Sequence, residues 1–499
     1  MAWLRGRSIG VLVLACALAA GLARTARGQS STAAEPGAPG GLLRTDSPRA
    51  LIPAEAESAA PWQRLPPVDE ALQVAYLQPG QPAAAADDRS ENRFGMLGLA
   101  FQEYVDRQKN PLGLPKGKPL LVIGGQVQAD AVYFGQDKIS QQSVGDLQDS
   151  ADFRRARLVM QGVSHDVYRY VFGVDFALAG RPSFLDMYIE HIDLPLLQNV
   201  RVGHFFEPFS LERVTQNRNN TFMERSLVDT FAPARNLGAM TYGCLASERA
   251  TWQVGTFRTG SNDYGNDSFD SGQALTLRGT CLPAWDEPSE GRHYVHLGAA
   301  YSFRDTYQDQ VRFKNSPEIR VEMPGAPNDF GPIFVDTGNI PARNFQLFDA
   351  EFAWINGPFS VQSEYALAAV DQIGGPNLFF DGLMVQLSYF LTGEHRPYDR
   401  QLGIHKRMIP FSNFFRVRTE ESGVQMGTGA WEIAARYSRI NLTDRNIAGN
   451  NLQDFTCGVN WYWNPYARVR FNYIRAYLDD AVFGPSVTNI WGMRMDFEF

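Results

Sequence analysis

Lysine is scarce in this chain. Of its 46 lysine and arginine residues, six are lysine and 40 are arginine. The 54 acidic residues outnumber them and leave a formal net charge of −8 in a chain of 499 residues. This balance excludes the basic character typical of a protein that binds nucleic acid, so no nucleic acid is expected as a partner. Any local positive charge must come mainly from arginine, which stays protonated and presents planar hydrogen-bond donors.

Cysteine is also rare, with four residues in the whole chain. Cys16 lies in the N-terminal segment, and Cys244, Cys281 and Cys457 are far apart. An odd number of widely spaced cysteines does not make a disulfide framework. No Cys–His cluster has the spacing of a metal site. We therefore expect small apolar side chains in strands, with no disulfide, metal or cofactor.

Long hydrophobic runs are missing, which excludes a membrane-spanning helix after the N-terminus. Residues 1–28 predict a secretory signal peptide, because Arg5 and Arg7 precede the apolar run from Ile9 to Ala23. Small residues then stand before a cleavage point after Gly28. Residues 29–118 are rich in Ala, Pro, Gly and Ser and predict a linker without a packed core.

What the chain does have is alternation, seen in its last residues, "WGMRMDFEF". Trp491, Met493 and Met495 alternate with polar residues or glycine, and Phe499 ends the chain. An alternating strand of this kind is an aggregation hazard in water. It suits a transmembrane β-barrel, whose strands show one face to lipid and the other to a wet interior.

Sixteen such segments follow residue 119, an even number that suits a closed antiparallel barrel. The fold class is therefore all-β, a transmembrane barrel over residues 119–499. The predicted strands are 121–134, 152–163, 168–179, 183–193, 199–206, 237–246, 249–258, 272–282, 293–304, 344–355, 358–370, 380–391, 430–442, 452–464, 466–478 and 488–499. Long connections at 207–236, 305–343 and 392–429 are expected at one end of the barrel, and short turns at the other.

The strand pattern assigns faces to the charged residues. A charge against lipid costs roughly 2–4 kcal/mol at the bilayer midplane, so the charged face must point inward. The inward arginines are Arg155, Arg157, Arg169, Arg201, Arg278, Arg436, Arg468, Arg470 and Arg494. Barrel closure brings those of the last strands beside those of the first, which predicts a basic wall that attracts anions. Asp349, Glu351, Glu364 and Glu432 are expected opposite. In the alternative, the facing charges only neutralise one another.

The connection 207–236 combines charges with large apolar residues, including Phe209, Phe222 and Phe231. Such a segment is expected to fold into the lumen and narrow it. Its charged residues include Glu212, Arg213, Arg218, Glu224, Arg225, Asp229 and Arg235. The alternative is that the apolar residues cover a contact between trimer subunits.

Three stretches resemble a known family, the phosphate-selective porins O and P of bacterial outer membranes. They are "RVGHFFEPFSLERVTQNRNNTFMERSLVDTFAPARNLG" from Arg201, "SYFLTGEHRPYDR" from Ser388, and "GAWEIAARYSRINLTD" from Gly429, continued by "GVNWYWNPYARVRFNYIRA" from Gly458. "FRRARL" from Phe153 adds to the likeness. The resemblance covers about residues 119–499. It implies a trimeric outer-membrane porin of sixteen strands with a loop folded into the pore.

The sequence thus predicts an outer-membrane porin that passes small hydrophilic solutes and prefers small anions, phosphate among them. It would meet outer-membrane lipid on its outside and form a homotrimer. One alternative is a plugged barrel with a structural or adhesive role. A barrel enzyme is a further alternative, although the chain contains no GxSxG, HExxH or Walker motif.

Overall fold

The computed structural model describes residues 120–499, apart from 166, 178–181, 246, 261–264, 266–271, 322–331 and 420–422. The predicted signal peptide and linker lie outside the described residues, and so do residues 178, 179 and 246 of two predicted strands.

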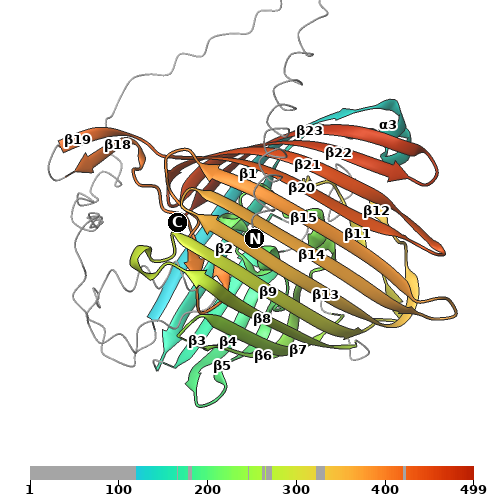
Figure 1. Ribbon diagram of the computed structural model, residues 1–499, viewed down its shortest axis with the longest axis horizontal. Helices are drawn as coiled ribbons and strands as arrows, with labels where there is room; N and C mark the ends of the chain where they lie inside the picture. Colours follow the sequence, from blue (N-terminus) through green and yellow to red (C-terminus); the bar gives the residue numbers. More distant parts are fainter. Residues whose placement is uncertain are drawn as a thin grey trace, which may run out of the picture. The chain divides into compact units, whose positions relative to one another are not determined.

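Sixteen long strands form one closed antiparallel barrel, as predicted (Figure 1). They are β1 Leu120–Gln136, β2 Ser150–Ser164, β3 Tyr168–Asp175, β4 Ser183–Leu194, β5 Gln198–Phe206, β6 Arg235–Leu245, β7 Ala250–Arg258, β8 Gln273–Trp285, β9 His293–Asp305, β13 Ile340–Asn356, β14 Phe359–Gln372, β15 Leu378–Phe390, β20 Ala430–Asp444, β21 Ile447–Asn464, β22 Ala467–Asp480 and β23 Gly484–Glu498. The barrel closes where β1 pairs with β23, from Gln126 opposite Glu498 to Gln136 opposite Thr488.

Shorter elements occupy the connections. The two-residue strand β10 Gln310–Val311 pairs with the start of β13. Three small hairpins are β11 Lys314–Asn315 with β12 Val335–Asp336, β16 Tyr398–Asp399 with β17 Ile404–His405, and β18 Phe414–Thr419 with β19 Gly423–Thr428. The described helices are α3 Lys138–Val144, α4 Leu211–Val214, η2 Asn217–Asn219, η3 Leu227–Phe231 and η4 Glu287–Ser289. None of these described helices is long and apolar enough to cross a membrane.

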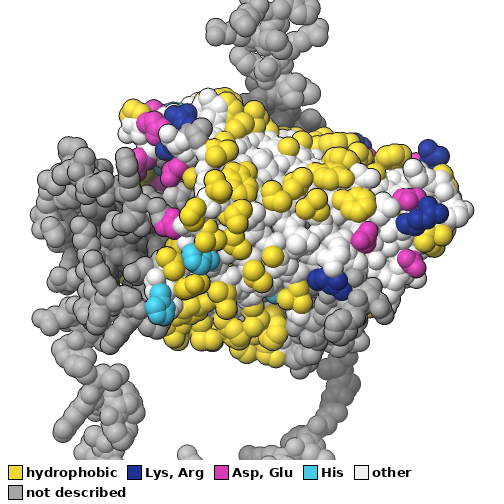
Figure 2. All heavy atoms as spheres, turned by 90° about the horizontal axis from the view of Figure 1, so that it is seen from below, with side chains coloured by type: hydrophobic (Ala, Val, Ile, Leu, Met, Phe, Trp, Pro, Cys, Tyr) yellow, Lys and Arg dark blue, Asp and Glu magenta, His cyan; other side chains and the backbone are white. Residues whose placement is uncertain are grey.

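The two faces of the wall follow the predicted alternation. On β22, Phe471 is 45% exposed on the outside, whereas its neighbour Arg470 is completely buried inside. On β21, Phe455 and Val459 are exposed, and Thr456 and Asn460 are buried. Figure 2 shows hydrophobic side chains over much of the visible wall, with charged side chains toward its ends. This pattern places apolar atoms against lipid and polar atoms in the interior.

Aromatic side chains gather at one end of the outer face. Trp431 stacks on Trp461 with ring centroids 5.0 Å apart, and Phe414 of β18 meets Trp461 edge-on at 4.6 Å. Such rings suit the boundary between lipid and water, where Trp and Tyr are enriched. The described cysteines, Cys244, Cys281 and Cys457, are free, and β7 separates Cys244 on β6 from Cys281 on β8.

One predicted feature of the connections is wrong. The segments 207–234 and 306–339 follow β5 and β9 and leave the barrel at one end, but 391–429 follows β15 and leaves at the other. In an antiparallel barrel the ends alternate from strand to strand, so this segment starts from the end that holds most of the short turns and the C-terminal residue. Figure 1 shows β18 and β19 near the C-terminal end and β11 and β12 at the far end. Short turns face the periplasm in outer-membrane barrels, so 391–429 belongs to the periplasmic end.

The last residue takes part in closing the barrel. The Gly125 nitrogen donates to the Phe499 carbonyl at 3.0 Å, and the Phe499 nitrogen donates to the Gly125 carbonyl at 3.2 Å. The Phe499 ring is 62% exposed on the outside. A Cβ on Gly125 would lie 2.3 Å from this ring, so the glycine makes room for it. Phe499 therefore contributes both backbone pairing and an apolar outer contact.

Deleting Phe499 is expected to impair assembly, because it removes two hydrogen bonds of about 1 kcal/mol each from the seam. The measurement is the fraction of protein that migrates as a compact, heat-modifiable barrel on a denaturing gel. Phe499→Ala is the matched control, since it keeps the backbone bonds and removes only the ring. If the deletion variant assembles as well as the wild type, the last residue has no part in closure.

Candidate functional site

The segment 207–234 crosses the barrel interior. It joins neighbouring strands β5 and β6, yet its helix η3 packs against β14, β15 and β20. These strands lie five to seven places from β6 around the wall. Phe209, Phe222 and Phe231 are at most 1% exposed. Because the segment reaches the opposite wall, its apolar side chains are buried inside the barrel itself and need no neighbouring subunit to cover them.

Hydrogen bonds fix the start of this segment on β14. The Ser210 hydroxyl donates to one oxygen of Glu364 at 2.5 Å, and the Glu212 nitrogen donates to the other at 2.9 Å. The same hydroxyl accepts from the Arg213 nitrogen and caps the single turn of α4. A buried carboxylate on the far wall therefore anchors the first turn of the segment.

The wall binds five consecutive carbonyl groups of the segment, from residue 220 to residue 224. Four of the donors are inward arginines that the sequence singled out. The donors and acceptors are Arg468 to Asn220 at 3.2 Å, Asn460 to Thr221 at 2.9 Å, Arg470 to Phe222 at 2.6 Å, Arg494 to Met223, and Arg436 to Glu224 at 3.0 Å. The arginines thus hold this stretch of the segment along β20 to β23.

Glu224 is the most heavily paired acid of the segment. Its carboxylate lies 3.0 Å from Arg154, 3.2 Å from Arg155 and 2.6 Å from Arg494. Burial alone would raise the pKa of Glu224, but the positive charges of these arginines together hold the pKa well below its ordinary value. Glu224 therefore stays ionised at neutral pH. Its ion pairs join the segment to strands β2 and β23.

The predicted basic wall is not uniformly basic. The structure places all nine arginines in the interior, and each lies within ion-pair distance of a carboxylate. The pairs are Arg155 with Glu224, Arg157 with Asp175, Arg169 and Arg201 with Glu190, Arg278 with Glu351, Arg436 with Glu212 and Glu318, Arg468 and Arg470 with Asp496, and Arg494 with Asp130 and Glu224. A buried arginine needs a carboxylate partner to offset the cost of its desolvation. The residue pattern of a single strand does not reveal that partner.

Arg213 and Arg225 on the segment, and Arg235 at the start of β6, stabilise the fold of this region. Arg213 and Arg225 donate to backbone carbonyls of the segment, at 2.7–3.1 Å, and Arg235 pairs with Asp186 on β4 at 3.0 Å. All three guanidinium groups lie within 5.7 Å of the Phe206 ring centroid. Arg218 instead reaches the C-terminal strand and pairs with Glu498 at 2.9 Å.

Two further segments also enter the interior, beyond the one predicted from the sequence. From the long-loop end, Glu318 of the segment 306–339 is 2% exposed and binds Arg436 and Ser438 of β20. From the periplasmic end, Arg396 of 391–429 pairs with Glu432 at 3.3 Å. The signal was present in the sequence, because both segments carry apolar residues such as Phe313 and Ile404, now buried.

Several guanidinium groups of the wall keep free donors. Arg155 Nε, Arg468 Nη2 and Arg470 Nε are buried and have no hydrogen-bond partner among the described residues. On the opposite wall, both oxygens of Asp349 are likewise buried without a described partner, beside the paired positions of Glu351 and Glu364. The interior therefore carries unsatisfied donors on one side and unsatisfied acceptors on the other.

The sequence of the barrel matches a known protein family. A sequence model described as "Phosphate-selective porin O and P" matches residues 122–499. Porin O of Pseudomonas aeruginosa is 26% identical over 390 residues, which cover 72% of this chain and 83% of that protein.

Among solved structures, the outer membrane channel DcaP of Acinetobacter baumannii has a TM-score of 0.46 at 12% identity, covering 77% of this chain and 99% of that one. An anion-selective porin from Comamonas acidovorans has a TM-score of 0.45 at 10% identity, covering 77% and 100%. The family match spans the barrel from its first strand to its last residue, and the chain belongs to the phosphate-selective porin O and P family.

Proposed function

We propose that this outer-membrane porin lets small hydrophilic solutes diffuse through its interior and prefers anions. Its family consists of porins, which favours a channel over an enzyme. The preference would come from the arginines of β2, β22 and β23, whose fixed planar donors suit phosphate and carboxylate. Rings of such side chains select anions in other pores.

The observation that carries the proposal is the set of free donors on the wall. Arg155, Arg468 and Arg470 each have a partner carboxylate, yet each keeps at least one N–H group without a partner among the described residues. A buried donor left unsatisfied costs about 1–3 kcal/mol, more when it is charged. The positive charge of these incompletely paired guanidinium groups would attract a passing anion and repel a cation.

The acidic net charge of the whole chain does not contradict an anion preference. Charges more than about 8 Å from the permeating ion are screened at physiological salt. Charges inside the barrel, whose wall has a low dielectric constant, act directly on that ion. Asp349, Glu351 and Glu364 lie on β13 and β14, away from the arginines of β22 and β23. An ion that follows the arginine side therefore meets a local field opposite in sign to the net charge.

A second candidate is a plugged barrel, which the amount of inserted chain favours. Among the described residues, three connections enter the interior, and the largest cluster of buried apolar residues joins Phe209, Phe231 and Phe313 to inward residues of the wall such as Leu347 and Ile474. Planar bilayers separate the two candidates. Steady open-channel current supports the porin, and silence at every voltage supports the plug.

A preference for phosphate over other small anions is a more specific proposal. The family description points to phosphate, while the six lysines leave arginine as the main source of positive charge. We also propose a homotrimer, as the family resemblance implies. Replacing chloride by phosphate in the solution on either side of a planar bilayer tests the phosphate preference. The mass of the purified protein tests the homotrimer.

A further inference from the structure

The hairpin of β16 and β17, within the segment 391–429, lies inside the periplasmic end of the barrel against β7, β8 and β9. Four of its side chains are at most 6% exposed, namely Tyr398, Leu402, Ile404 and His405. Gln253 of β7 donates to the Leu402 carbonyl at 3.1 Å, and Arg278 of β8 donates to the Gly403 carbonyl at 2.9 Å. We call residues 397–406 in this position the seated hairpin.

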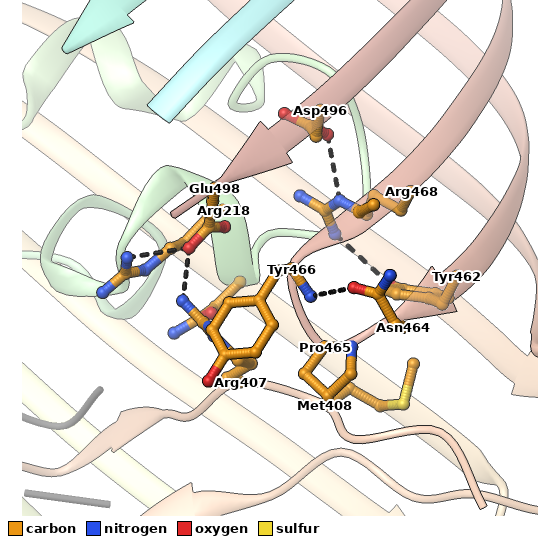
Figure 3. Close-up of a pocket in the computed structure, with 12 residues that line it drawn as sticks. Arg218, Arg407, Met408, Tyr462, Asn464, Pro465, Tyr466, Arg468, Asp496 and Glu498 are labelled. Atoms are coloured by element: carbon orange, nitrogen blue, oxygen red, sulfur yellow. Dashed lines mark hydrogen bonds and ion pairs between the residues drawn. The ribbon is translucent and has the colours of Figure 1, made fainter. Parts of the chain in front are cut away.

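An ion pair holds the chain on each side of the seated hairpin. Before it, Arg396 pairs with Glu432 of β20 at 3.3 Å. After it, Arg407 pairs with Glu498 of β23, whose carboxylate also pairs with Arg218 at 2.9 Å. Figure 3 shows the guanidinium groups of Arg407 and Arg218 pointing toward Glu498. The part of the chain between the two ion pairs can therefore leave the wall without releasing the rest of the segment.

His405 lies in the contact between the seated hairpin and β9. Its Nδ1 is 3.1 Å from the Tyr294 hydroxyl, which donates to the Arg396 carbonyl at 3.3 Å. A hydroxyl has one hydrogen, so this chain of bonds assigns the proton of the neutral His405 ring to Nδ1. The Nε2 of His405 is buried and has no hydrogen-bond partner among the described residues. A second proton would therefore make Nε2 a buried donor without an acceptor, which is unfavourable.

The charges around His405 also oppose its protonation. Arg396 of its own segment, His296 of β9 and Arg278 of β8 face it. Burial and the repulsion from these groups hold the pKa of His405 well below its ordinary value. The charged groups of the other neighbouring elements have partners of their own: Glu351 of β13 pairs with Arg278 and His296, Glu432 with Arg396, Glu212 of α4 with Arg436, Arg213 of α4 with Asp229, and Asp399 of β16 accepts from the backbone of residues 401 and 402.

His296 differs from His405 because both of its ring nitrogens have partners. Its Nδ1 is 2.6 Å from the Tyr398 hydroxyl, and its Nε2 is 3.0 Å from the Glu351 carboxylate. A second proton on His296 leaves neither nitrogen unsatisfied, because the Tyr398 oxygen can accept. Of these two histidines, His405 is the one whose protonation opposes the seated position.

We infer that the seated hairpin is an acid-sensitive gate, which stays on the wall at neutral pH and leaves it in acid when His405 takes up a proton. In water a histidine takes up its proton near pH 6.5. The displaced hairpin thus binds a proton that the seated hairpin excludes, so seating is fully stable above about pH 6.5 and weakens below it. The ratio of displaced to seated molecules rises up to about tenfold per pH unit. The inference adds regulation to the proposed channel and rests on it only where current is measured.

Hydrogen–deuterium exchange of residues 397–406 tests the displacement without any current. It is measured by mass spectrometry between about pH 7.5 and about pH 5 and corrected for the intrinsic effect of pH, and it scales with the fraction of opened molecules. Exchange in the wild type is expected to rise up to about thirtyfold in acid. His405→Gln, which takes up no proton in this range, is expected to show no rise. His293→Gln is the matched control and is expected to keep the wild-type response, because His293 is exposed at the start of β9.

Single-channel conductance in planar bilayers over the same pH range gives the functional readout. Protonation of wall carboxylates acts alike on the wild type and on His405→Gln, so the difference between them isolates the hairpin. Wild-type conductance is expected to rise in acid relative to that of His405→Gln. Heat-modifiable migration on a gel shows that each variant is assembled.

The two measurements separate failure of the gate from failure of the channel. If exchange in acid is the same in the wild type and in His405→Gln, the gate is wrong. A difference in exchange without a difference in the conductance of open channels also overturns the gate, because the hairpin would then move outside the ion path. A difference in exchange in a protein that carries no current supports the displacement by acid and overturns the proposed channel instead.

Discussion

Replacing residues 208–233 with a short Gly–Ser linker is expected to raise single-channel conductance roughly twofold or more and to admit larger solutes. The reason is that the segment crosses from β5 and β6 to β14, β15 and β20 and fills the section between them. The replacement also removes the five consecutive carbonyl groups that the wall binds and the buried phenylalanines of the segment. The measurement is conductance in planar bilayers, together with the rate at which sugars of increasing size enter proteoliposomes.

The control for this deletion is a variant in which a connection at the rim of the barrel is shortened instead. Residues 286–292 join β8 and β9 at the periplasmic end, and Glu287 and Glu290 there are exposed. Shortening this turn is expected to leave conductance unchanged. Heat-modifiable migration on a gel shows that both variants assemble. An assembled 208–233 variant with wild-type conductance would place the constriction elsewhere, and the segments 306–339 and 391–429 would then be tested in turn.

Changing Arg155, Arg157, Arg468 and Arg470 to Gln is expected to reverse the ion preference from anions to cations. The four substitutions remove four positive charges and leave their partners Glu224, Asp175 and Asp496 with fewer counter-charges. Breaking a buried pair on one side costs about 3–5 kcal/mol, so the barrel is also expected to be less heat-stable. The readout is the reversal potential in a salt gradient, which reports charge near the ion path.

A charge-matched variant separates local from global effects. Arg249, Arg312, Arg343 and Arg445 have side chains 35–65% exposed, and replacing them by Gln changes net charge by the same four units. This variant is expected to keep the wild-type preference. If the anion preference survives the loss of the four interior arginines, these arginines do not determine the ion selectivity. Holding the segment 220–224 would then be the role left to the arginines of the wall.

The barrel was predictable from sequence because the environment of each strand repeats every two residues. Arg470 and Phe471 must face opposite sides, and the cost of a charge in lipid decides which side is which. Counting such segments predicted the correct number of barrel strands, and the predicted and observed barrel strands differ only at their ends, whereas the short strands β10–β12 and β16–β19 in the connections were not predicted. The strand predicted at 344–355, for example, extends over Ile340–Asn356.

The interior was less predictable, because its contacts join residues far apart in sequence. Nothing local to Arg436 indicates that Glu212 and Glu318, from two different segments, will meet it. The entry of 391–429 from the periplasmic end could have been deduced from the parity of the strands. Its pairing of Arg396 with Glu432 and the sharing of Glu498 by Arg218 and Arg407 depend on folded geometry alone.

The most direct test of the central claim is the reversal potential of the unmodified channel in a potassium chloride gradient. Steady current with a potential of the sign set by chloride is the result expected if arginines line the ion path. A potential of the sign set by potassium would contradict anion preference. A complete absence of current, from protein shown to be assembled by its heat-modifiable migration, would contradict the channel itself.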